Sequence, residues 1–213
     1  MTAKETIQKR LNGIAETQYF LRQKMFDSLK VININPAFRV NFGGKSNYYE
    51  YFVYSYGDRF FDMSTLIRLA TEIENGLRNY YMEKRSHNNL TDLKNDPAYK
   101  KCKLGLFQRL SVTSRDDNVV SFFKSELNYN LQTNPFILNM QELMLIRHLY
   151  VHNSGILNEK FIDDYKKLMG VDISKLPVVV NEGFPQEDVC WFEPLKKLGD
   201  FIESSRKFFE ELP

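Results

Sequence analysis

The segment 136–152, FILNMQELMLIRHLYVH, constrains the fold of this chain most strongly, because it is apolar on almost every side. No helix-breaking residue interrupts it before Gly155, and Ser154-Gly155 is a suitable helix end. A helix that is apolar all round must be covered on most of its surface. We therefore expect it at the centre of a helical bundle or at an interface with a second subunit. Its apolar residues are Phe136, Ile137, Leu138, Met140, Leu143, Met144, Leu145, Ile146, Leu149 and Val151.

Amphipathic patterns predict further helices on both sides of this segment. Apolar residues recur at helical spacing over about 2–32 and 64–85, and again through residues 158–170 and 187–212. One or two shorter helices are expected within 104–133, starting from a Ser or Asp cap. The predicted fold class is therefore all-α, a bundle of five to seven helices.

Three segments lack a clear helical pattern. Residues 86–103 are polar and contain turn formers, so we interpret them as a surface linker. Residues 45–62 are rich in aromatic side chains and fit either a short strand or an aromatic helical turn, and residues 171–186 form a connector that has room for a short strand. A short β hairpin insertion is compatible with these patterns. The length of 213 residues predicts a single domain over 1–213.

The composition is typical of a folded protein with no strongly charged partner. Aromatic residues make up 14% and charged residues 26% of the chain, which argues against disorder. The net charge is only +2, so the molecule as a whole gives no electrostatic argument for binding nucleic acid. No signal-peptide pattern and no apolar run near the roughly 18 residues of a membrane span occur. Cys102 and Cys190 lack C-x-x-C spacing and fit reduced thiols. We expect a cytoplasmic protein with no membrane partner.

Arg147 interrupts the apolar helix, one turn after Leu143 and one turn before Val151. Burying a guanidinium without a partner is very costly, because the group keeps its charge. An anion is therefore expected to meet it. Two kinds of anion fit: a carboxylate of another helix, such as Glu72 or Glu74, or the phosphate of a ligand.

His148 and His152 are spaced i and i+4, so they share one face of the same helix. This spacing suits a two-histidine metal site, but the Glu of the H-E-x-x-H pattern is missing and the only other histidine is His87. A third ligand would have to be a carboxylate or a distant cysteine. We therefore expect no metal ion and no other cofactor.

An arginine and a histidine on one helix end suit one defined chemistry. The chain has no G-x-S-x-G, P-loop or G-x-G-x-x-G pattern, so neither an activated serine nor a phosphate-cradling loop is indicated. A histidine titrates near neutral pH and can move a proton, while an arginine neutralises charge on a phosphoryl group. RNA supplies its own nucleophile in the 2′-hydroxyl. The pair Arg147 and His152 is therefore a candidate for RNA cleavage.

The segment RHLYVH resembles the R-x(4–6)-H motif of the HEPN superfamily, in which the residue after the arginine is commonly Asn, Asp or His. The continuation HNSGIL is similar to the H-N-x-G ending of many HEPN proteins in bacterial defence and toxin systems. Proteins of that superfamily are all-α bundles with the motif near the end of a long helix. The resemblance is specific over residues 147–157 and architectural over the rest of the chain.

This resemblance implies a metal-independent endoribonuclease that acts on an RNA substrate as a homodimer. It also implies a role in a toxin-antitoxin or phage-defence system, with an antitoxin protein as a possible further partner. Arg147 would bind and stabilise the scissile phosphate, and His152 would act as general acid or base. His148 would orient or contact the RNA, and Asn153 would cap the helix or hold His152. The alternative is a non-catalytic helical dimer of the same type that binds nucleotide or a protein partner, with its polar cluster satisfied by internal acids.

Overall fold

The described part of the chain confirms the all-α fold class. The computed structural model describes residues 1–34, 57–102, 106–110, 118–153, 155, 157–171, 178–180, 190–192 and 195–213. The longer helices within them are α1 (Ala3–Ile34), α3 (Gly57–Lys84), α6 (Val119–Leu127), α7 (Ile137–Asn153), α8 (Glu159–Met169) and α9 (Leu195–Glu210). The described ranges also contain two short helices, α4 (Leu90–Asn95) and α5 (Pro97–Lys101), and two 3-10 turns, η3 (Leu106–Gln108) and η4 (Leu131–Thr133).

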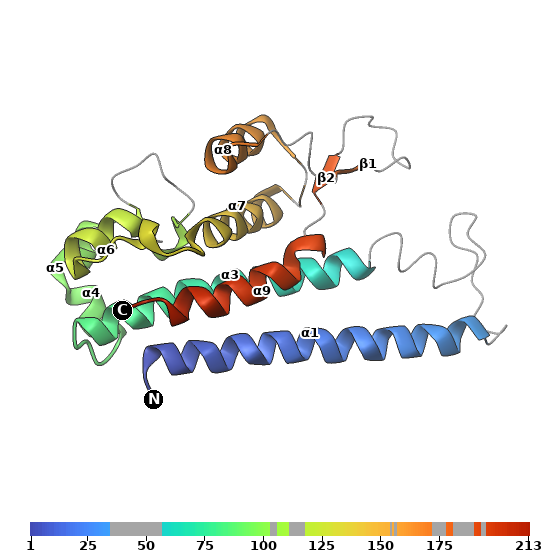
Figure 1. Cartoon of the computed structure of the whole chain (residues 1–213), viewed down its shortest axis with the longest axis horizontal. Coiled ribbons are helices and arrows are strands. Elements are labelled where there is room, and N and C mark those ends of the chain that lie inside the picture. Colours follow the sequence, from blue (N-terminus) through green and yellow to red (C-terminus); the bar gives the residue numbers. More distant parts are fainter. Residues whose placement is uncertain are drawn as a thin grey trace.

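The long helices form a layered bundle (Figure 1). α1 packs against α3 and α9, which also contact each other. α7 lies on the other side of α3 and α9, and α8 covers α7 from outside (Figure 1). Within the described ranges, no helix is both long enough and apolar enough to cross a membrane.

α7 is buried by other helices of the same chain. Its buried side chains run from Ile137 to Leu149, and α3, α8 and α9 all contact it. Leu138 and Val151 are the apolar side chains of α7 that remain exposed, at 41% and 45%. Packing within one chain therefore accounts for the apolar character that the sequence predicted for this helix, without a second subunit.

A buried carboxylate joins α7 to α8 and α9. Glu142 of α7 is 3% exposed and accepts hydrogen bonds from the Tyr165 hydroxyl of α8 and the Lys197 ammonium of α9. Burial raises the pKa of Tyr165, and the hydrogen bond to Glu142 raises it further, so the hydroxyl stays protonated and donates. These contacts fix the position of α8 against α7.

The segment 86–103 contains α4 and α5, so its interpretation as a surface linker was wrong. Asn89 begins α4, since its side chain accepts a hydrogen bond from the Asp92 N–H and the Asp92 carboxylate accepts one from the Asn89 N–H. Asp96 caps α5, and Pro97 occupies the first turn. Both helices are started by local capping interactions, which a search for apolar periodicity does not detect.

A short antiparallel hairpin pairs β1 (Val178–Val180) with β2 (Cys190–Phe192). β1 lies in the connector where the sequence has room for a strand. β2 occupies residues predicted as the start of the terminal helix, so α9 begins only at Leu195. The pairing of valines with Trp191 and Phe192 is typical of strands.

Two helices begin at other residues than predicted. α3 starts at Gly57, ahead of residue 64, while residues 45–56 of the ambiguous aromatic segment lie outside the described ranges. α6 starts after Asn118, whose side chain accepts a hydrogen bond from the Ser121 N–H, and not after a Ser or Asp. Asparagine caps a helix as well as either of those residues does.

Gly76 lies where α1, α3 and α9 pack too closely for a side chain. A Cβ atom at this position would be 2.5 Å from the Phe209 ring and 2.9 Å from Cγ1 of Ile7. We expect Gly76→Ala to lower the free energy of unfolding by about 1–3 kcal/mol, because overpacking of the core exceeds the gain in helix propensity. Denaturant unfolding measures the change. Gly13→Ala is the control, since nothing lies within 4 Å of its Cβ position, and equal stability of both variants would contradict the packing argument.

Candidate functional site

The C-terminal end of α7 carries the residues predicted for the site. The Gly155 N–H donates a hydrogen bond to the Leu149 carbonyl, and Gly155 has a φ of +80°, which favours glycine. A Cβ atom there would also lie 2.5 Å from the Tyr150 ring. The predicted glycine stop is therefore confirmed. It leaves Arg147, His148, His152 and Asn153 in the last two turns of the helix.

Arg147 faces α3. Its Nη1 lies 3.8 Å from Oε1 of Glu74, and the two side chains are 17% and 12% exposed. Glu72, the other carboxylate named from the sequence, pairs with Arg10 at 3.1 Å. The anion that meets Arg147 in this structure is thus Glu74, at a distance longer than a hydrogen bond. Nε of Arg147 is buried and has no hydrogen-bond partner among the described residues.

His148 and His152 face α8 and not α3. Their side chains are exposed, and their ring centroids are 4.4 Å apart, as the i, i+4 spacing predicted. Both line an open pocket between α7 and α8, to which α7 also contributes Asn153. Arg147 is not part of the pocket lining. The remaining lining residues are Leu145, Leu149, Asn158, Lys160, Phe161 and Asp164.

The pocket combines positive and titratable groups. Burial lowers the pKa of His148, and the charges of His152, Lys160 and Arg147 lower it further, while Asp164 acts in the opposite direction. A histidine with a lowered pKa is mainly neutral at pH 7 and can accept a proton. The positive charge of Lys160 and the negative charge of Asp164 cancel, so protonation of either histidine gives the pocket a net positive charge.

The two histidines form at most part of a metal site. In the parts of the chain that the structure describes, no three His, Cys, Asp or Glu side chains are placed to hold a metal ion together. Chemically, the pocket offers imidazoles for proton transfer, an ammonium for an anion, and amide groups for hydrogen bonds.

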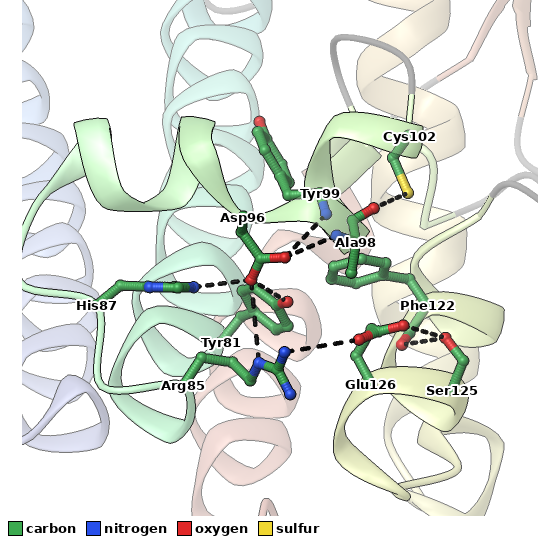
Figure 2. A network of polar contacts seen from close by, with 10 residues as sticks. All are labelled: Tyr81, Arg85, His87, Asp96, Ala98, Tyr99, Cys102, Phe122, Ser125 and Glu126. Carbon is green, nitrogen blue, oxygen red and sulfur yellow. Dashed lines mark hydrogen bonds and ion pairs between the residues drawn. The ribbon is translucent and has the colours of Figure 1, made fainter.

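A second polar cluster, which we call the Asp96 cluster, was not predicted from the sequence (Figure 2). The Asp96 carboxylate accepts hydrogen bonds from the Tyr81 hydroxyl and from Nε2 of His87, each at 2.8 Å, and from the backbone N–H groups of Ala98 and Tyr99. Nε of Arg85 lies 3.9 Å away. The cluster joins the end of α3 to the start of α5.

The Asp96 carboxylate stays ionised inside this cluster. Burial alone would raise the pKa of Asp96, but hydrogen bonds from His87, Tyr81 and two backbone amides outweigh burial and lower the pKa to about 2. His87 Nε2 must therefore donate its proton to the carboxylate. The Asp96-Pro97 pair was the available signal, because an aspartate followed by proline is typical of a helix start.

No family model, no curated protein and no solved structure matches this chain. The resemblance to the HEPN superfamily therefore rests on the residues at the end of α7 and on the helical architecture.

Proposed function

We propose that the protein is a metal-independent endoribonuclease of the HEPN type that acts in a toxin-antitoxin or phage-defence system. The exposed pair of His148 and His152 carries this proposal, because the helix that presents them is otherwise mainly buried and they line an open pocket. A concave site lined by imidazoles is a usual place for acid–base catalysis. Arg147 lies on the same helix end and can supply a positive charge.

The chemistry needs no nucleophile from the protein. The 2′-oxygen of RNA attacks the neighbouring phosphorus, and the bond from phosphorus to the 5′-oxygen breaks. His152 would take the proton from the 2′-hydroxyl or deliver one to the leaving 5′-oxygen. Arg147 would neutralise charge on the phosphate, while His148 and Asn153 would contact and orient the RNA. The products are a 2′,3′-cyclic phosphate and a 5′-hydroxyl.

Arg147 would have to leave Glu74 in order to reach a phosphate. The ion pair is 3.8 Å long, and the guanidinium is partly exposed. Arg147 and His152 are five residues apart, which is about 140° around the helix and about 7.5 Å along its axis. A homodimer in which two α7 ends face each other would bring an arginine and a histidine from different subunits to one phosphate.

Cleavage in the presence of EDTA tests this function. We expect the wild-type protein to cut mixed-sequence RNA in excess EDTA and to leave the same sequence with 2′-O-methyl groups intact, because methylation removes the nucleophile. Denaturing gels give the extent of cleavage, and mass spectrometry identifies the cyclic phosphate. Cleavage of the methylated RNA would contradict the mechanism, and failure to cut any unmodified RNA would remove the nuclease proposal.

The second candidate is a non-catalytic helical dimer that binds nucleotide or a protein partner. The contact between Arg147 and Glu74 favours this candidate, because an internal carboxylate already neutralises the charge of the arginine without a bound phosphate. This candidate predicts no cleavage of RNA. It also predicts that substitutions of Arg147 and Glu74 change the free energy of unfolding to a similar extent.

A further inference from the structure

We propose that Lys160 of α8 holds a phosphate group against His148 and His152 in the pocket between α7 and α8. The ligand class, a phosphate ester of RNA, rests on the proposed function. The placement of Lys160 beside the two histidines does not, because it follows from the packing of α8 on α7.

The two candidate cations differ in what they face. Lys160 lines the same pocket as His148 and His152 and is exposed, so its ammonium is open to an incoming anion. Arg147 is outside that lining and lies beside Glu74 on α3. Within one chain, the cation already placed beside the two imidazoles is therefore Lys160, whereas Arg147 would have to leave Glu74 or come from a second subunit.

α8 holds the backbone of Lys160 in a fixed position. The Asn158 side chain caps the helix by accepting a hydrogen bond from the Phe161 N–H at 2.8 Å. Phe161 and Tyr165 are buried in the core, and Tyr165 is hydrogen-bonded to Glu142 of α7. Lys160 thus projects from a helix turn that is anchored to the histidine-bearing helix, and only its own side chain has to be ordered on binding.

The charges around the pocket favour an anion once a histidine is protonated. The titratable and charged groups that line the pocket are His148 and His152 on α7 and Lys160 and Asp164 on α8, and Arg147 acts on His148 from outside the lining. Lys160 lowers the pKa of His148 more than Arg147 does, which agrees with its position in the pocket. A bound phosphate would offset these positive charges and favour the protonated imidazoles. Phosphate binding is therefore expected to strengthen as the pH falls and the imidazoles become protonated.

The histidine side chains report binding without any cleavage reaction. The protein has three histidines, so each can be followed by NMR during pH titration. With a nucleoside 3′-monophosphate as probe, we expect the pKa of His148 to rise and the NMR signals of the His148 and His152 rings to shift. His87, already hydrogen-bonded to Asp96, is the internal reference, and the uncharged nucleoside is the ligand control.

Substitutions on α8 test Lys160 directly. Lys160→Met is expected to weaken binding of the probe at least about tenfold, because a charge-assisted hydrogen bond is lost, whereas Lys160→Arg should retain binding. In the protein without probe, Lys160→Met should raise the pKa of His148. Lys167→Met is the matched control, since it removes the same charge from an exposed position two turns further along α8, outside the pocket lining.

The outcomes separate this inference from the proposed function. Three results would overturn the role of Lys160, even in a protein that cleaves RNA. The first is that the probe leaves the NMR signals of His148 and His152 in the wild type unshifted. The others are undiminished binding of the probe by Lys160→Met and an equal loss of binding in Lys167→Met. Binding of the probe that depends on Lys160 in a protein that cleaves no RNA would support the phosphate pocket and remove the nuclease proposal.

Discussion

His152→Ala is expected to lower the rate of RNA cleavage by about 100-fold to 10,000-fold, the usual loss when a general acid or base is removed. The side chain is exposed at the end of α7, so its truncation should leave the core and the melting temperature nearly unchanged. The measurement is the initial rate on mixed-sequence RNA in EDTA. Val151→Ala removes an exposed neighbouring side chain and should keep full activity. Undiminished cleavage by His152→Ala would remove His152 from the mechanism.

The effect of Arg147→Ala on cleavage has to be compared with a different control variant, because Arg147 is partly buried. Its loss should reduce cleavage to a similar extent, since the charge on the phosphate would no longer be neutralised. Glu74→Gln breaks the same ion pair and keeps the guanidinium, so it should retain or increase cleavage. Equal loss of activity in Arg147→Ala and Glu74→Gln would assign Arg147 a structural role only.

Asp96→Ala is expected to lower the free energy of unfolding by about 3–5 kcal/mol, because it leaves buried donors without their acceptor. Asp96 is 4% exposed, and its carboxylate accepts hydrogen bonds from the side chains of Tyr81 and His87 and from two backbone amides at the start of α5. Denaturant unfolding at pH 7 gives the change. A loss below about 1 kcal/mol would show that the cluster contributes little to stability.

The pH dependence of stability follows from the same carboxylate. The pKa of Asp96 falls from 3.8 to about 2 on folding, so its ionised form stabilises the folded state above about pH 4, and this contribution is lost as the pH falls towards 2. A difference of nearly two units corresponds to about 2.5 kcal/mol. In Asp96→Asn, the decrease in stability between pH 5 and pH 2 should be smaller by this amount. Asp163→Asn, at an exposed position of α8, should retain the wild-type pH dependence.

The sequence predicted the helices that carry a long apolar pattern. The buried α7, its glycine end, the long α1 and the shared face of His148 and His152 all follow from periodicity and spacing within one segment. The partner of Arg147 could be narrowed to two kinds of anion, because a buried guanidinium requires one. Glu74 was among the named carboxylates, and the structure places it beside the arginine.

Features that depend on contacts between segments were not predictable. Lys160 lines one pocket with the histidines only because α8 packs on α7 through Phe161 and Tyr165, and the pattern of α8 alone does not say which helix it will cover. The Asp96 cluster likewise exists only after α4 and α5 fold back towards the end of α3, bringing Asp96 to Tyr81 and His87 (Figure 2).

The side chains of α7 are mostly buried up to Leu149 and partly or fully exposed after it, and the candidate site lies where this change occurs. Most side chains from Ile137 to Leu149 are buried against three other helices, while Val151 and His152 lie in an exposed final turn that ends at Gly155. Backbone amides in the core part exchange with solvent only through extensive unfolding, whereas those of an exposed terminal turn exchange through local fraying. The last turn of α7, which carries His152, is therefore expected to fray while the bundle beneath it stays folded.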